Sequence, residues 1–225
     1  MDDYDLAELR RCYGGTPLRR SELQTHPMQQ FHRWFSAALD AGMAEPNAMV
    51  LATATAHGVP RGRTVLMKGY DDSGLWFFTN RSSRKGAELA ENPRASAVFP
   101  WHWMRRQVIV TGRVEYLSAA ENDAYFAQRP YGSQLGAWTS ERQSEPIESR
   151  SVLEQRFMDY HRRWPKDQAE VPRPDSWGGY RLCPTEIEFW QGQADRLHDR
   201  FRYVPNAPNV PTGDAAAWHI ERLTP

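Results

Sequence analysis

The stretch AMVLATATAHGVPRGRTVLMKGYDDSGLWFFT, residues 48–79, decides the fold. Runs rich in β-branched and aromatic residues cover 48–55, 61–70 and 75–79. They are separated by His57-Gly58 and by Asp71-Asp72-Ser73-Gly74, and turns of this composition between such runs are typical of β-hairpins. The stretch therefore predicts three consecutive antiparallel strands.

The flanking sequence adds helices and further strands. Upstream, residues 1–24 are polar and basic and predict an arm, whereas residues 25–225 are expected to form one domain. From Pro27 onward apolar residues recur at helical spacing, which predicts a helix facing the core. Downstream we expect helices over 83–91, 118–128 and 148–164, the second opened by a Ser118–Glu121 capping box, and strands over 95–100, 107–117, 179–190, 199–204 and 216–223. Antiparallel strands with inserted helices predict an α+β protein with a closed or split β-barrel.

Composition excludes several classes of function. The chain has 28 basic and 28 acidic residues, so it has no general attraction for nucleic acid or an anionic membrane. No run approaches the roughly 20 apolar residues of a membrane span, and Cys12 and Cys183 have neither metal-ligand nor disulfide-scaffold spacing. We expect a cytoplasmic protein without a metal site, in which local clusters bind any anion.

The first such cluster is Asn80-Arg81-Ser82-Ser83-Arg84-Lys85, between a predicted strand and a predicted helix. Free N–H groups at a helix start, hydroxyl groups and cations favour a phosphate ligand. A solvated helix cap with surface charges is the alternative.

The second cluster, Arg61 to Lys68, embeds cations in a half-buried strand, where they need partners. On a regular strand Arg63 and Lys68 point to opposite faces, so both reach one site only through a bulge, a strong twist or contacts to different parts of a ligand.

Two further clusters lie downstream. If residues 196–200 are extended, Arg196, His198 and Arg200 share one face, which favours an anion over them, although a charged edge strand is the alternative. Tyr125 and Arg129, spaced i and i+4 at a helix end, are followed by Ser133 in a predicted turn and suggest a second phosphate site, although such a pair is also an ordinary helix neighbour.

Together these segments resemble the pyridoxine 5′-phosphate oxidase family over nearly the whole chain. The motifs that carry the resemblance are Arg63-Thr64-Val65-Leu66-Met67-Lys68, Phe77-Phe78-Thr79-Asn80, Ser83-Arg84-Lys85, Phe99-Pro100-Trp101, Arg129-Pro130, Ser133-Gln134, Gly136-Ala137-Trp138, Gln143-Ser144, Trp177-Gly178-Gly179-Tyr180, Glu188-Phe189-Trp190-Gln191-Gly192 and Arg196-Leu197-His198-Asp199-Arg200. The resemblance implies an FMN-binding split barrel that works as a homodimer, with each flavin held by both subunits.

The resemblance also implies the site residues. The implied flavin contacts are Arg63, Thr64, Val65, Leu66, Met67, Lys68, Phe78, Thr79, Arg84, Lys85, Gln107, Gln143, Ser144, Trp190 and Arg200. The implied substrate contacts are Arg10, Arg11, Cys12, Tyr13, Lys68, Tyr125, Arg129, Ser133, Arg196, Leu197 and His198. Arg196 and His198 are expected to act at the reacting end of the substrate.

The implied reaction oxidises pyridoxine or pyridoxamine 5′-phosphate to pyridoxal 5′-phosphate, with transfer of hydride to the flavin and of electrons to dioxygen, which yields hydrogen peroxide. The alternatives are a related FMN split-barrel oxidase of phenazine precursors and a non-catalytic carrier of FMN or pyridoxal phosphate. Two departures from the family pattern concern the flavin contacts. Phe78 stands where the family often has tyrosine, and residues 140–143 are one residue longer than the common pattern, which affects Gln143 and Ser144.

Overall fold

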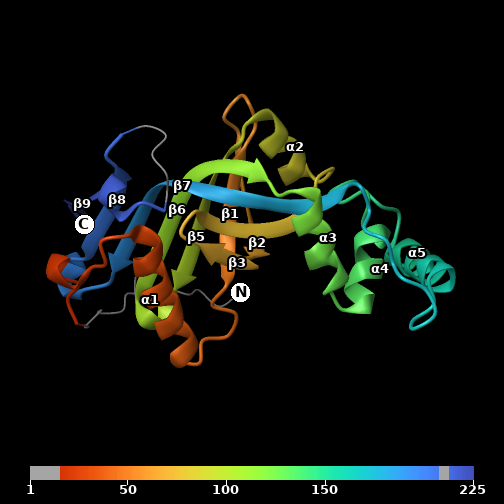
Figure 1. Ribbon diagram of the computed structural model, residues 1–225, viewed down its shortest axis with the longest axis horizontal. Coiled ribbons are helices and arrows are strands. Elements are labelled where there is room, and N and C mark those ends of the chain that lie inside the picture. The colour runs from red at the N-terminus through yellow and green to blue at the C-terminus, as the bar shows by residue number, and fades with distance from the viewer. Residues whose placement is uncertain (1–15, 208–212) are drawn as a thin grey trace, which may run out of the picture.

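A twisted antiparallel sheet organises the computed structural model, which describes residues 16–207 and 213–225 (Figure 1). Its strands are β1 (Ala48–Ala54), β2 (Pro60–Leu66), β3 (Gly69–Asp71), β4 (Gly74–Asn80), β5 (Arg94–Trp101), β6 (Arg106–Tyr116), β7 (Trp177–Gln191), β8 (Asp199–Pro205) and β9 (Trp218–Leu223). The helices are α1 (Pro27–Asp40), α2 (Arg84–Glu91), α3 (Ala119–Ala127), α4 (Tyr131–Thr139) and α5 (Arg150–Arg163), with 3₁₀ turns at Arg20–Glu22, His102–Met104, Ala194–Arg196 and Ala215–Ala217. Within the described residues, no helix is both long and apolar enough to cross a membrane.

The long strand β7 explains why the sheet is split. The main order is β2-β1-β5-β6-β7-β4-β3, while β8 pairs with β7 and β9 pairs with β8. Along one side of β7, the first half pairs with β4 and the second half with β8. The sheet therefore forks along β7 into two branches, and the predicted α+β split barrel is confirmed.

A β-bulge bends the sheet near this fork. The register of β6 and β7 shifts between Thr111 and Gly112. A Cβ atom at Gly112 would lie 2.0 Å from the carbonyl oxygen of Cys183, so only glycine allows this close approach.

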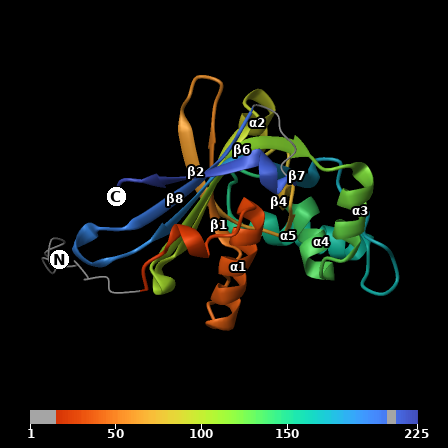
Figure 2. The same cartoon turned by 60° about the vertical axis from the view of Figure 1, so that its left-hand side comes forward.

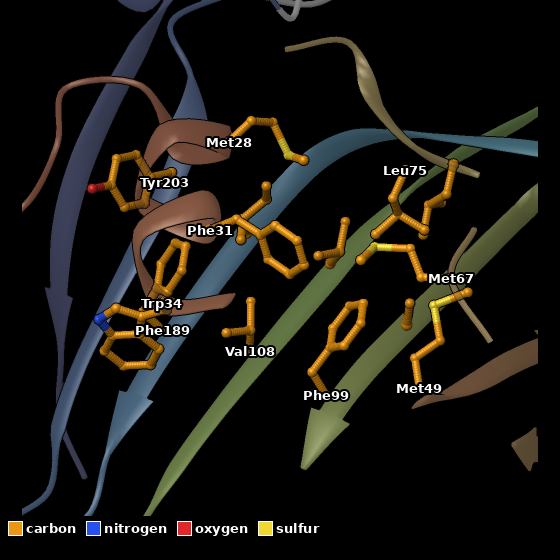
Figure 3. Close-up of a cluster of buried hydrophobic side chains, with 14 of the residues drawn as sticks. Met28, Phe31, Trp34, Met49, Met67, Leu75, Phe99, Val108, Phe189 and Tyr203 are labelled. Atoms are coloured by element: carbon orange, nitrogen blue, oxygen red, sulfur yellow. The ribbon is translucent and has the colours of Figure 1, made fainter. Parts of the chain in front are cut away.

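Helix α1 closes the main core against the sheet (Figure 3). Phe31 and Trp34 are 0% and 2% exposed, and their rings meet Phe99 and Phe189 edge-on at centroid distances of 5.1 and 5.2 Å. Such edge-to-face pairs add to the stabilisation from burial alone. The predicted core-facing helix from Pro27 is confirmed.

A second, separate apolar cluster joins α3, α4 and α5 to the start of β7. Its buried members are Phe126, Leu135, Ala137, Trp164, Val171 and Trp177. In Figure 1 these three helices lie at the opposite end of the molecule from β8 and β9, and in Figure 2 the C-terminus, which follows β9, lies on the left while α3 and α4 lie on the right. Site residues on α3 and α4 and those on β8 therefore lie far apart within one copy of the chain.

Most of the predicted elements are present, with three corrections. The expected continuous strand 61–70 is broken into β2 and β3, because Met67 turns into the core at 3% exposure. Ser133, expected in a turn, lies in α4, and residues 194–196 form a 3₁₀ turn in which Asp195 and Arg196 have φ values of 52° and 61°. Arg196 and His198 therefore do not continue the β8 strand with Arg200, and the interpretation of a shared extended face is wrong.

Candidate functional site

The larger cavity of the candidate site lies between β2, β4 and the start of α2. It encloses about 770 Å³ and is lined by Arg61, Gly62, Arg63, Thr64, Val65, Leu66, Lys68, Phe78, Thr79, Arg84, Lys85, Gln143 and Ser144. Eleven of these residues belong to the predicted flavin set, and the cavity unites them from three separate segments of the sequence. The helix predicted to begin at Ser83 is also present, and the Ser83 hydroxyl accepts a hydrogen bond from the Gly86 N–H.

Lys85 is the most deeply buried cation that lines this cavity. The residue is 8% exposed, and its Nζ donates to the Thr79 hydroxyl at 2.9 Å and to Gln143 Oε1 at 3.4 Å. Burial and the nearby Arg63 guanidinium lower the pKa of Lys85 to about 8, while Glu88 acts in the opposite direction. A buried ammonium with only neutral hydrogen-bond partners favours an anionic ligand beside it.

A buried carboxylate stands behind the cations. Glu88 on α2 is 3% exposed and accepts hydrogen bonds from Arg61 Nη1 at 2.5 Å, from Arg63 Nη2 at 3.2 Å and from the Thr53 hydroxyl. Burial raises the pKa of Glu88, but these three hydrogen bonds outweigh it and hold the pKa below its usual value. The sequence analysis recognised that cations in this strand need partners but did not identify Glu88, because nothing local links a helix residue to a strand 25 residues earlier.

The loop that follows α4 reaches the cavity through Asn80. Asn80 Nδ2 donates to the carbonyl oxygens of Ser140 and Glu141 at 3.1 and 2.7 Å. Ser144 Oγ then accepts from the Arg84 N–H at 3.4 Å. Gln143 and Ser144 thus line the cavity despite the longer loop.

A smaller cavity adjoins the first. It encloses about 290 Å³ and is lined by Lys68, Phe78, Tyr125, Gln128, Arg129, Pro130, Ser133 and Trp177. Lys68 and Phe78 line both cavities. Because the chain is broken between β2 and β3, Lys68 reaches the same cavity as Arg63, which resolves the strand-parity problem.

The predicted trio Tyr125, Arg129 and Ser133 lines this smaller cavity from α3, the connection that follows it and the first turn of α4. Burial lowers the pKa of Arg129 and raises that of Tyr125. In the described part of the chain Arg129 has no ion pair, and its buried Nη1 has no hydrogen-bond partner. An uncompensated guanidinium in a half-buried cavity is suited to a phosphate.

The remaining flavin residues lie together at another place in the fold. Gln107, Trp190 and Arg200 are direct cross-strand neighbours on β6, β7 and β8. Gln107 and Trp190 line a third cavity of about 180 Å³ with His102, Arg105 and Arg106. Arg200 donates to both carboxylate oxygens of Glu188 at 2.8 and 3.0 Å.

The predicted catalytic residues follow this third group. The rings of His198 and Trp190 lie 4.7 Å apart, and His198 Nδ1 accepts a hydrogen bond from the Gln193 N–H. Arg196 lies in the 3₁₀ turn, and Leu197 is 71% exposed. None of these residues lines either of the first two cavities in one copy of the described chain.

Two sets of predicted contacts remain. The side chain of Met67 lies in the main core, which leaves only its backbone for a ligand. Arg10, Arg11, Cys12 and Tyr13 lie outside the described residues.

Comparison with known proteins identifies the family of this chain. Residues 35–163 match the family model described as pyridoxamine 5′-phosphate oxidase, and residues 177–225 match the one described as pyridoxine 5′-phosphate oxidase C-terminal dimerisation region. The pyridoxine/pyridoxamine 5′-phosphate oxidases of Thermobifida fusca (strain YX) and Trichormus variabilis are 56% and 49% identical, covering 100% and 99% of this chain and 100% of each relative. The crystal structure of PhzG from Burkholderia lata 383 in complex with tetrahydrophenazine-1-carboxylic acid superposes with a TM-score of 0.82 at 31% identity, covering 92% of this chain and 98% of that one.

The fold and the matches define a class, the split-barrel flavoprotein oxidases. Within it, the chain belongs to the pyridoxamine 5′-phosphate oxidase family.

Proposed function

We propose that this protein oxidises pyridoxine 5′-phosphate or pyridoxamine 5′-phosphate to pyridoxal 5′-phosphate, with FMN as its cofactor and as a homodimer. The observation that carries the proposal is the pair of adjoining cationic cavities that share Lys68 and Phe78. One cavity suits the phosphate of a cofactor and the other that of a substrate, so the two ligands would meet between them. The relatives that share about half of its residues over their full length are named for this activity.

The larger cavity fits FMN. Its buried Lys85, paired only with neutral oxygens, supplies the charge that a terminal phosphate requires, and Arg63 and Arg84 lie beside it. Thr64, Val65, Leu66 and Lys68 border the same cavity from β2 and its end, whereas the Met67 side chain lies in the main core. When bound, FMN accepts the hydride that leaves C4′ of the substrate.

The smaller cavity fits the phosphate of the substrate. Lys68, Tyr125, Arg129 and Ser133 offer two cations and two hydroxyl groups, which is a sufficient donor set for a phosphate monoester. By holding the phosphate, these residues orient C4′ toward the larger cavity. Substrate and FMN are then held next to each other, so that the reaction between them is effectively unimolecular.

The third group of residues enters the site from the second subunit. Gln107, Trp190 and Arg200 are neighbours across β6, β7 and β8, and Arg196 and His198 lie just before β8. Figure 1 shows β8 at the end of the molecule opposite α3 and α4. The family model that covers β7 to β9 is a dimerisation region. We propose that each site combines the two cavities of one subunit with Trp190, Arg196 and His198 of its partner.

In this arrangement Arg196 and His198 act at the reacting end of the substrate. Arg196 holds the oxygen or nitrogen substituent at C4′, and His198 moves a proton from it, since an imidazole can both accept and donate a proton. Dioxygen as the final electron acceptor and a location in the cytoplasm stay predictions.

The structural likeness to PhzG makes a phenazine-type oxidase the second candidate. Tyr125, Arg129 and Ser133 argue for a phosphorylated substrate instead, because they surround a small cationic cavity next to the larger one.

The decisive experiment supplies FMN-loaded protein with pyridoxine 5′-phosphate and, separately, with unphosphorylated pyridoxine. We expect aldehyde absorbance and hydrogen peroxide to appear together with the phosphorylated substrate alone. Bound yellow flavin with no turnover of either compound would support the carrier or the phenazine-type oxidase and overturn the proposal.

A further inference from the structure

The Trp177-Gly178-Gly179 segment at the start of β7 has no part in the site as proposed so far, yet Trp177 forms a wall of the smaller cavity. Its side chain is 6% exposed. The guanidinium carbon of Arg129 lies 4.8 Å from the centroid of its ring. The segment therefore contacts the cation that the proposed function assigns to the substrate phosphate.

Aromatic rings are the main surroundings of this guanidinium. The ring centroid of Phe126, a residue of α3, lies 5.6 Å from Arg129 Cζ. Within the described residues no carboxylate neutralises the arginine. A cation over a ring face is attracted by the ring's quadrupole, and more strongly where water is excluded. This attraction fixes the side chain without a competing negative charge, so the full charge stays available to an anion.

Gly179 lets the same segment carry a second ring. Residue 179 lies opposite Phe78 in the β4–β7 register, and a Cβ atom there would lie 2.7 Å from the Phe78 ring. Without that Cβ, Phe78 lies parallel to Trp177 at 5.1 Å and to Tyr125 at 3.9 Å. Trp177, Phe78 and Tyr125 thus form an aromatic stack that supports two of the predicted phosphate contacts.

We propose that Trp177 is a positioning residue that holds Arg129 in place for the substrate phosphate. The inference rests on the proposed function and deepens it, because it says how one member of the phosphate site is held. It follows that Trp177 controls the affinity for phosphorylated ligands, whereas FMN content and the affinity for unphosphorylated pyridoxal do not depend on it.

The experiment uses full-length, FMN-loaded protein with Trp177→Leu, which removes the ring, and Trp177→Phe, which keeps a ring face. Two quantities are measured: KM and kcat for pyridoxine 5′-phosphate, and the dissociation constant of pyridoxal 5′-phosphate by equilibrium dialysis. We expect Trp177→Leu to raise KM and the dissociation constant about tenfold with kcat changed much less, and Trp177→Phe to stay within about threefold. Flavin content and thermal midpoint report folding, and Trp177→Met replaces Trp177→Leu if the latter does not fold.

A double-mutant cycle with Arg129→Ala separates positioning from a general loosening of the fold. If Trp177 acts through Arg129, Trp177→Leu has almost no further effect on the dissociation constant in the Arg129→Ala background. Equal effects in both backgrounds would overturn the inference, and so would a loss of pyridoxal binding that matches the loss of pyridoxal 5′-phosphate binding.

The cycle is read by binding as well as by turnover, so the two proposals fail in different ways. Wild-type protein that binds pyridoxal 5′-phosphate but oxidises neither substrate would contradict the proposed function and leave the cycle interpretable. Normal turnover with additive effects would contradict only the role of Trp177.

Discussion

The two cavities hold their cations by different means. Behind the larger cavity, the Glu88 carboxylate is hydrogen-bonded to Arg61 and Arg63 and fixes both side chains. Beside the smaller cavity, Arg129 has aromatic faces instead and, in the described part of the chain, no ion pair. The first arrangement compensates part of the positive charge in advance, and the second leaves it uncompensated.

This difference matches the ligands proposed for the two cavities. A cofactor that stays bound through many turnovers needs a rigid, preformed cavity, and buried ion pairs with good geometry supply rigidity. A substrate must be bound and its product released in every turnover. An uncompensated cation such as Arg129 attracts the phosphate without ion pairs that would have to break and form again each time. The first two predictions test each half of this comparison.

Removing Glu88 should have the largest effect. Glu88→Ala leaves the Arg61–Arg63 pair without its counter-charge, and breaking a buried pair costs about 3 kcal/mol. We expect the free energy of unfolding from urea titration to fall by about that amount and the protein to be purified with little flavin.

Glu88→Gln is the matched control, because it keeps the size and a hydrogen-bond acceptor. Since the folded-state pKa of Glu88 is below its unfolded value, its carboxylate stabilises the fold above about pH 4, and this contribution is lost as the pH falls through the folded pKa. The stability gap between wild type and Glu88→Gln should therefore close on acidification. A constant gap down to pH 3 would contradict the role of the ion pairs.

Replacing Arg129 should have the next largest effect, and only on the substrate. Hydrogen bonds to charged groups contribute about 1.5–3 kcal/mol, so Arg129→Ala should raise KM for pyridoxine 5′-phosphate about 10- to 100-fold. Flavin content should not change, because Arg129 does not line the larger cavity. Arg129→Lys keeps the charge but loses the planar guanidinium, so its KM should lie between those of the wild type and Arg129→Ala. Loss of flavin in Arg129→Ala would contradict the proposal that the larger cavity binds FMN and the smaller cavity binds only the substrate.

The sequence predicts most of this fold and less of the site, for physical reasons. Local signals were sufficient for the Ser118–Glu121 capping box and for the helix start at Ser83, because both depend on residues three apart. They were not sufficient for Glu88 or Trp177, whose partners are 25 and 48 residues away in the chain. The turn at 194–196 was missed because its positive φ values fall on Asp195 and Arg196 rather than on glycine.

The protonation of Lys85 sharpens the comparison further. With a pKa near 8 that burial and Arg63 have lowered, Lys85 loses its charge as the pH rises above about 8 in the flavin-free protein. The affinity for FMN should then fall, by up to about tenfold per pH unit, whereas the affinity of Lys85→Arg for FMN should stay level. Because the pKa is lower in the folded than in the unfolded state, the flavin-free fold should become more stable between about pH 8 and 10. Fluorescence titrations of FMN at a series of pH values measure the first effect, and a flat profile for the wild type would show that Lys85 is not the titrating contact.

Phe78 borders both cavities, and its replacement by tyrosine should have the smallest effect. The ring is held by stacking on Tyr125 and Trp177, with interplanar angles of 7° and 8°, and tyrosine offers the same ring faces. We expect Phe78→Tyr to change KM and flavin affinity less than about twofold, since surface-like substitutions that keep their contacts stay within ±0.5 kcal/mol. Phe78→Leu is the contrasting variant, because it removes the stack and should raise KM about threefold. A gain of tenfold or more in flavin affinity by Phe78→Tyr would mean that a phenolic hydroxyl at this position hydrogen-bonds FMN in the larger cavity. Residue 78 would then affect the ligands of both cavities, which would be coupled rather than merely adjacent.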